Sequence, residues 1–370
     1  MSRKLLTLSV ATLLMATTLQ AQEVKNIIYL IGDGMGLASA SMMQLENNYE
    51  ATIFDHADNI ALQKTYSLDN RVTDSAAAGT ALATGAKTNN TMLGILPDGT
   101  TPQTLMELAS EHGKATGLVV TTYIQHATPA AFYAHVRSRH EYATISEQLL
   151  HSDIDIAIGG GMAFFDERYE GRERALKAIS ESGYALHHNL DDDTDDDKSL
   201  FILAEKEIEH REGYLAKATA KVLEHLEGDD DGFVLMVEGS IIDGAGHGND
   251  AEGQQREMHD FMEAIEVAVE YADNNPGTLV VVTADHETGG LSLISSNADF
   301  NLSEQGIEYR WSTDGHSGIM VPIYLYGTGA ELINGIVENS ALGAKLKAII
   351  AGQTPYNTTL APTTDTLARQ

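Results

Sequence analysis

Three short apolar runs in this chain each end in a carboxylate. The runs are 27–33, 233–238 and 279–286, and the last ends in an adjacent Asp-His pair. Runs rich in β-branched residues, without alternating polar positions, predict strands buried on both faces of a parallel sheet. Ligands in such sheets bind outside the carboxyl ends of the strands. We therefore expect the polar residues that end these runs to meet at one sheet edge: Asp33, Glu238, Asp285 and His286.

A looser fourth run, 118–122, leads to His126 and Thr128. Several carboxylates and a histidine crowded together repel and desolvate one another unless cations lie between them. Imidazole with carboxylate ligands is typical of zinc, whereas carboxylate, hydroxyl and water ligands suit magnesium. The pattern therefore predicts a site for several metal ions on an α/β sheet.

The stretches between the strands favour helices. Strands are expected near 27–31, 115–121, 154–158, 233–237, 278–283 and 320–326. Helices are expected over 34–44, 75–82, 103–111, 130–136, 172–181, 214–226 and 251–271, the third opened by Thr101-Pro102 and the fourth by Thr128-Pro129. Alternating strands and helices predict an α/β fold, a three-layer sandwich with a largely parallel central sheet and helices on both faces. No linker divides the chain, so we expect one domain over 22–370, with 160–212 as an insertion.

The first residues resemble a targeting segment. Arg3 and Lys4 precede the apolar stretch 5–14, and a small residue, Ala21, follows. This predicts a secretory signal peptide over 1–21, and hence an exported protein, periplasmic or secreted. The apolar stretch is too short to span a bilayer. The chain has no cysteine and so no disulfide, but an exported protein of this size can rely on its core.

The formal net charge is −31. Such a charge disfavours binding to nucleic acid or to anionic membranes, so we expect neither as a partner. The acidic run 191–197 is expected to be an exposed loop, with a calcium-binding loop as the alternative. Read from Asp191 as an EF-hand loop, however, the run has Asp196 in place of the required glycine and Ile202 in place of the required glutamate.

Ser75 follows Asp74 and opens a stretch of small residues. A helix N-terminus offers free N–H groups and a positive dipole end, which suit a phosphate group. A serine at a helix start is more often a capping residue than a nucleophile. No histidine is nearby in the sequence, so a reactive Ser75 would need a metal ion to activate it.

Further histidines and carboxylates have the spacing of metal ligands. Asp243 and His247 are four residues apart, which places both on one face of a helical turn. His316 lies in a Gly-His-Ser-Gly sequence. A single histidine is more often structural, but the occurrence of several of these residues at strand ends favours metal binding.

Seven blocks, in this order, resemble those of the alkaline phosphatase family. They are Gly32–Gly36, Asp74–Ala76, Ala127–Ala131, Val237–Gly239, Asp243 with His247, Ala284–His286 and Gly315–Gly318. The resemblance spans 26–326, and the Asp-His-Glu-Thr-Gly-Gly sequence at 285–290 is similar to that of the secreted bacterial branch.

The resemblance implies two zinc ions and one magnesium ion per chain. The first zinc would be held by Asp243, His247 and His316. The second would be held by Asp33, Asp285 and His286. The magnesium ion would be held by Asp33, Thr128 and Glu238.

The resemblance also implies roles in binding phosphate. Ser75 would be the nucleophile. Arg139, eleven residues after Thr128, would grip the phosphate oxygens with its planar guanidinium, and Arg137 is the alternative.

Three positions vary within the family or depart from it. His126 stands near magnesium where some members carry Asp and others His. Gly244 stands where many members have a larger side chain, and Thr288 replaces a second histidine. We expect these positions to affect metal affinity and product release rather than the reaction.

The implied function is hydrolysis of phosphate monoesters through a phosphoserine intermediate. Inorganic phosphate, a product inhibitor, and an alcohol would be released, and the family likeness implies a homodimer. One alternative is another metal-dependent hydrolase or mutase of the superfamily, such as a phosphodiesterase or a sulfatase. A sulfatase would need Cys or Ser in a C/S-x-P-x-R frame, whereas two alanines follow Ser75. The other alternative is a non-catalytic exported protein that binds metal or phosphate.

Overall fold

The computed structural model describes residues 23–355 except 195, 211 and 297–305. The predicted signal peptide, 1–21, lies outside the described residues. The strands are β1 (Asn26–Gly32), β2 (Asn59–Lys64), β3 (Ala115–Tyr123), β4 (Ile156–Gly160), β5 (Ala185–His187), β6 (Ser199–Ile202), β7 (Phe233–Gly239), β8 (Thr278–Thr283), β9 (Glu287–Thr288), β10 (Ser292–Ser295), β11 (Ile307–Arg310), β12 (His316–Ser317), β13 (Val321–Gly327) and β14 (Gly335–Glu338). The α-helices are α1 (Leu37–Glu46), α2 (Ser75–Thr84), α3 (Leu105–Glu111), α4 (Ala127–Ala130), α5 (Tyr142–Leu150), α6 (Met162–Arg168), α7 (Arg172–Glu181), α8 (Tyr214–Leu226), α9 (Ile241–His247), α10 (Ala251–Asn274) and α11 (Asn339–Ile350).

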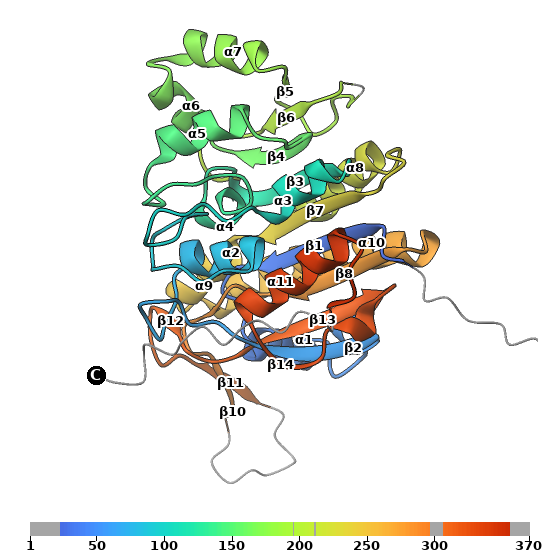
Figure 1. Ribbon diagram of the computed structural model, residues 1–370. Helices are drawn as coiled ribbons and strands as arrows, with labels where there is room; N and C mark the ends of the chain where they lie inside the picture. Colours follow the sequence, from blue (N-terminus) through green and yellow to red (C-terminus); the bar gives the residue numbers. More distant parts are fainter. Residues whose placement is uncertain (1–22, 195, 211, 297–305, 356–370) are drawn as a thin grey trace, which may run out of the picture.

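Ten of these strands form one central sheet in the order β14-β2-β13-β8-β1-β7-β3-β4-β6-β5. β13 runs antiparallel to its neighbours β8 and β2, and the other neighbouring pairs are parallel. Helices cover both faces of the sheet (Figure 1). The predicted α/β sandwich with a largely parallel sheet is therefore confirmed.

The central strands lack polar alternation because both of their faces are buried. In β1, Ile27, Tyr29 and Ile31 pack in a core that includes residues of α2, α3 and α11. The alternate residues Ile28 and Leu30 pack in a second core with α8 and α10. Successive side chains point to opposite faces of a strand, so an apolar run is needed to fill both cores.

All six predicted strands are present, and the sheet gains β2, β5, β6 and β14. Two of the added strands are short and poorly buried: β5 has three residues of intermediate burial, and β14 has four residues, none of them buried. β2 contains the exposed Ile60. Strands of this kind lack the continuous apolar run that marks a central strand.

Several predicted helices have different bounds in the structure, and two of these differences have a clear local cause. The helix expected over 130–136 is wrong, because α4 ends at Ala130 and Val136 instead pairs with Leu93 in an isolated bridge. The helix α3 begins at Leu105 rather than after Thr101-Pro102. Its start is set by Thr104, which accepts a hydrogen bond from the Glu107 N–H in a capping box.

The segment 160–212 follows β4 and contributes α6, α7, β5 and β6. The two strands extend the sheet beyond β4, in the order β4-β6-β5. Most of the described aspartates of the acidic run are exposed. The described residues of this run, 191–194 and 196–197, contain no helix or strand. The predicted exposed loop is therefore confirmed.

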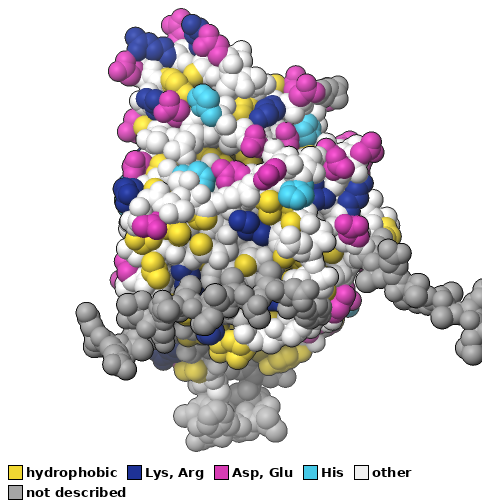
Figure 2. Space-filling view, in the orientation of Figure 1, with side chains coloured by type: hydrophobic (Ala, Val, Ile, Leu, Met, Phe, Trp, Pro, Cys, Tyr) yellow, Lys and Arg dark blue, Asp and Glu magenta, His cyan; other side chains and the backbone are white. Residues whose placement is uncertain are grey.

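The surface carries charged side chains of both signs. Acidic and basic side chains are interspersed over the face shown in Figure 2. Among the described residues, no helix combines the length and apolar character needed to cross a membrane.

Candidate metal centre

The polar residues that end the apolar runs meet at the carboxyl edge of the neighbouring strands β7, β1 and β8. Asp33 directly follows β1, and Glu238 lies in β7 opposite Ile31 of β1. Asp285 and His286 come just after β8. These four ionisable residues are fully buried, each 0% exposed. The fold therefore concentrates charge where the loops leave the sheet.

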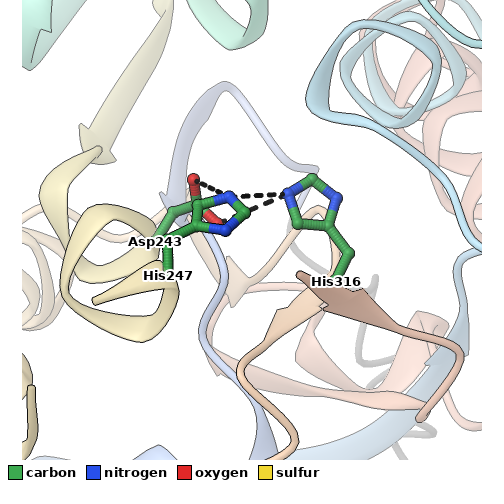
Figure 3. A group of neighbouring side chains, drawn as sticks. All are labelled: Asp243, His247 and His316. Carbon is green, nitrogen blue, oxygen red and sulfur yellow. Dashed lines mark hydrogen bonds and ion pairs between the residues drawn. The ribbon is translucent and has the colours of Figure 1, made fainter. Parts of the chain in front are cut away.

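A first group consists of Asp243, His247 and His316, shown in Figure 3. His247 Nε2 lies 3.3 Å from Asp243 Oδ2, and the Nε2 atoms of the two histidines are 3.2 Å apart. His247 Nδ1 donates to the Asp314 carbonyl at 2.6 Å, and His316 Nδ1 donates to the Thr73 carbonyl at 2.8 Å. These backbone contacts turn both Nε2 atoms inward, as ligand histidines require.

A second group consists of Asp33, Asp285 and His286. His286 Nε2 lies 3.0 Å from Asp285 Oδ2 and 3.5 Å from Asp33 Oδ1. The hydroxyl of Ser75 lies 3.2 Å from the same nitrogen. Three oxygen atoms therefore surround one imidazole nitrogen in a fully buried place.

A third group consists of Asp33, His126 and Glu238, each with a ligand atom within 4.8 Å of the others. Thr128, in α4, is also fully buried. Because Asp33 belongs to both the second and the third group, its two carboxylate oxygens can serve two neighbouring ions.

Burial raises the pKa of the two central carboxyl groups. The pKa of Asp33 lies well above its ordinary value because the group is buried, and the carboxylates of Asp285 and Asp243 raise it further. Burial raises the pKa of Glu238 to about 8. Bound cations would remove this cost by favouring the ionised forms.

The other two carboxyl groups have pKa values below the ordinary range. Burial raises the pKa of Asp285, but the charge of His286 and a hydrogen bond from it outweigh that effect. Burial likewise opposes the lowered pKa of Asp243, which a hydrogen bond from His247 produces. That contact in turn raises the pKa of His247 to about 9. Histidines thus stabilise the ionised carboxylates of Asp285 and Asp243, whereas neither carboxylate oxygen of Asp33 has a hydrogen-bond partner.

Buried atoms without hydrogen-bond partners test whether metal ions fit this site. At this site they include both carboxylate oxygens of Asp33, Asp285 Oδ2, Glu238 Oε1, Thr128 Oγ1 and His126 Nδ1. Folded proteins rarely leave such atoms unsatisfied. The first two groups combine imidazole and carboxylate, which suits zinc, and the third is richer in oxygen, which suits magnesium. The residues present therefore fit the predicted ions.

The start of α2 is fixed by Asp74. Its Oδ1 accepts a hydrogen bond from the Ala77 N–H at 3.0 Å, and its Oδ2 accepts one from the Thr91 N–H at 3.0 Å. Ser75, the first helical residue, is 2% exposed. The serine hydroxyl is thus held beside the second group and at the positive end of a helix dipole.

Arg139 is the arginine that reaches this site. It donates from Nη2 to His126 Nε2 at 3.1 Å and from Nη1 to Asp74 Oδ2 at 3.4 Å. Burial and the neighbouring guanidinium of Arg139 lower the pKa of His126 to about 3, so its imidazole is neutral. Arg137 is exposed, and its Nη2 lies beside Gly99.

Thr288 and Asp74 also belong to the site, although neither is among the metal ligands or phosphate-binding residues predicted from the sequence. Thr288 Oγ1 donates to Asp243 Oδ1 at 2.5 Å and lies 3.2 Å from His286 Nδ1, so it contacts ligands of both the first and second groups. Asp74 is visible in the sequence as a helix cap, but its contact with Arg139 depends on the fold.

Comparisons with known proteins agree with this geometry. The family model described as alkaline phosphatase matches residues 24–305. Alkaline phosphatase 4 of Bacillus subtilis is 36% identical, with 86% of this chain and 87% of the relative covered. Alkaline phosphatase from the Antarctic bacterium TAB5 is 34% identical with a TM-score of 0.83, covering 90% of this chain and 99% of the other. A His-to-Asp variant of the TAB5 enzyme, 33% identical to this chain with a TM-score of 0.84 and the same coverage, has magnesium bound in its M3 site. The chain therefore belongs to the alkaline phosphatase family, whose activity is metal-dependent hydrolysis of phosphate monoesters.

Proposed function

We propose that this alkaline phosphatase hydrolyses phosphate monoesters through a phosphoserine intermediate on Ser75. The observation that carries the proposal is the 3.2 Å approach of Ser75 Oγ to His286 Nε2, within the second ligand group and at the start of α2. A hydroxyl among metal ligands is in the position of an activated nucleophile.

The proposed cofactors are two zinc ions and one magnesium ion. Zinc would be held by the first group (Asp243, His247 and His316) and by the second (Asp33, Asp285 and His286). Magnesium would be held by Asp33, Glu238 and Thr128, beside His126. When bound, such ions lower the pKa of coordinated hydroxyls and water and neutralise charge on the leaving oxygen.

The chain's own residues bind and orient the phosphate group. The Arg139 guanidinium would contact two phosphate oxygens, and the positive end of the α2 dipole would favour the same anion. Ser75 Oγ gives up its proton to water and forms a bond to phosphorus while the bond to the alcohol oxygen breaks, and that oxygen takes a proton from water. Water hydrolyses the phosphoserine, which releases inorganic phosphate and restores the serine. Positioning and charge stabilisation carry most of the catalysis in such transfers.

We also propose a product inhibitor, an oligomeric state and a location for this protein. Inorganic phosphate, which binds the same groups as the substrate, is the expected product inhibitor. Family likeness supports a homodimer, and the signal-peptide pattern over 1–21 supports export to the periplasm or the medium. The net charge of −31 argues against nucleic acid or an anionic membrane as a partner.

Ser75→Ala is expected to lower turnover of a chromogenic phosphate monoester by several orders of magnitude, because no nucleophile remains. Metal content and fold should be retained. Ser146→Ala, at another fully buried serine, is the matched control and should keep full activity. Acid quenching of the wild type with substrate, followed by peptide mass spectrometry, should find phosphate on Ser75. Phosphate on another residue, or a preference for a phosphate diester or a sulfate ester, contradicts the proposal.

Chelation is expected to abolish activity, and reconstitution should restore it at two zinc ions and one magnesium ion per chain. The buried carboxylates and histidines of this site form three ligand groups, and each group is expected to hold one ion. Elemental analysis of fully active protein measures the ratio. Full activity with about one zinc ion per chain would reject the two-zinc assignment.

Arg139→Ala is expected to weaken inhibition by inorganic phosphate and to lower kcat/KM. The loss should be about 1.5–3 kcal/mol, as for a hydrogen bond to a charged group. Arg137→Ala is the matched control, because it removes the same charge two residues away from an exposed position. A larger effect of Arg137→Ala on both quantities would reverse the assignment.

His126→Asp is expected to reduce the dependence of activity on added magnesium. A neutral imidazole brings no negative charge to the third group and suits zinc better than magnesium, whereas a carboxylate can hold magnesium or orient its waters. The TAB5 variant with aspartate in place of a histidine and magnesium bound supports this expectation. Magnesium titrations of both proteins decide the point, since identical activation curves would leave His126 without a role in metal choice.

A further inference from the structure

One aromatic ring packs against the His126 imidazole, and two further rings pack against that ring. Tyr123, the last residue of β3, meets His126 edge to face, with centroids 5.2 Å apart and planes at 87°. Phe164 lies 4.7 Å from Tyr123, and Tyr142 lies 5.7 Å from it. Tyr142 and Phe164 are 4.6 Å apart. We call Tyr123, Tyr142 and Phe164 the aromatic cluster, and each of its members contacts the other two.

The aromatic cluster joins the centre of the sheet to the segment 160–212. Tyr123 comes from β3, Tyr142 is the first residue of α5, and Phe164 belongs to α6 inside that segment. Gly161, just before α6, has φ +113°, and a Cβ there would lie 2.1 Å from Gln125 Oε1. The backbone at the start of α6 thus packs directly against the residue that precedes His126.

The His126 imidazole, in turn, holds the arginine. Arg139 Nη2 donates to His126 Nε2 at 3.1 Å, and the other contact of the guanidinium, with Asp74, is longer at 3.4 Å. The Tyr123 ring packs edge to face against the same imidazole, so this packing and the hydrogen bond from Arg139 together set the orientation of the ring.

We infer that Tyr123 is a positioning residue for phosphate binding: its ring fixes the plane of His126, and His126 fixes the guanidinium of Arg139. The inference rests on the proposed role of Arg139 in gripping phosphate. An arginine side chain loses much rotational freedom when it is held in one geometry. A guanidinium that is already oriented binds phosphate more tightly, because less of that freedom remains to be lost on binding.

The ring of Tyr123, not its hydroxyl, carries this role. The Tyr123 and Tyr142 hydroxyl oxygens are 3.4 Å apart, which is long for a hydrogen bond between hydroxyls. Phenylalanine would keep the edge-to-face contact with His126 and the packing against Phe164. Leucine would remove both while remaining apolar.

The segment 160–212 gains a function from the same contacts. Through Phe164 it supports the ring that orients His126, besides extending the sheet with β5 and β6. A purely structural role would stabilise the junction of β3, α5 and α6 without changing phosphate affinity, and this difference can be measured.

The experiment compares Tyr123→Leu, Tyr123→Phe and Tyr184→Leu in protein loaded with zinc and magnesium. Tyr184 is the control: it is another tyrosine, lies within 160–212, is 3% exposed and donates from its hydroxyl to the Ile154 carbonyl at 2.5 Å. Calorimetric titration with inorganic phosphate measures Kd, steady-state kinetics separates KM from kcat, and thermal unfolding measures Tm.

Tyr123→Leu should weaken phosphate binding by roughly two- to tenfold, the range that corresponds to losing one edge-to-face aromatic pair. Tyr123→Phe should restore wild-type affinity, and Tyr184→Leu should lower Tm without changing Kd. If Tyr123→Leu lowers Tm to a similar extent and leaves Kd unchanged, the inference is overturned. It is equally overturned if Tyr123→Phe loses as much affinity as Tyr123→Leu.

A double-mutant cycle with Arg139→Ala separates this inference from the proposed function. If Tyr123 acts through Arg139, Tyr123→Leu should weaken phosphate binding no further once Arg139 is alanine. An additive loss in the double variant overturns the positioning role but leaves the role of Arg139 intact. Unchanged phosphate affinity in Arg139→Ala alone overturns the proposed grip, and with it the inference that depends on it.

Discussion

Repulsion among buried carboxylates is the constraint on which the rest of this structure depends. Asp33, Glu238 and Asp285 are fully buried at the ends of neighbouring strands; burial raises the pKa of Asp33, and the charges of Asp285 and Glu238 raise it further. Leaving a charged group in such a place without a partner is costly. Bound cations would stabilise the ionised carboxylates. Because the ligands are already held close together, they need little reorganisation to coordinate an ion.

The sheet supplies the rigidity that holds these charges together. β1 is paired on both sides, with β7 and β8, and its alternate side chains fill two separate cores. The loops beyond the sheet orient the histidines of the first group: the carbonyls of Thr73 and Asp314 accept hydrogen bonds from His316 and His247. A metal centre needs both parts, because the ligands must be close together and must also present the correct nitrogen.

The sequence predicts the parts of this site that follow from local pattern and family motifs. The apolar runs identify β1, β7 and β8, and the Asp243-xxx-His247 spacing places two predicted ligands on one face of α9. Contacts between distant segments could not be predicted in this way. The hydrogen bond from His316 to Thr73 and the packing of Phe164 on Tyr123 depend on how loops and helices meet in the folded chain. The edge strands β5 and β14 were missed for a related reason, since pairing with a neighbour rather than an apolar run makes them strands.

The proposed role of Arg139 would explain how a strongly acidic protein binds an anionic substrate. Distant surface acids are screened over about 8–10 Å at moderate salt, so the charges in the site dominate the local field. The arginine is held by one contact of 3.1 Å to a neutral imidazole and by a longer one of 3.4 Å to Asp74. Neither contact is a bidentate ion pair, so donors of the guanidinium remain available to a phosphate group. A tighter grip by Asp74 would compete with the substrate, whereas a neutral partner such as His126 orients the arginine without neutralising its charge.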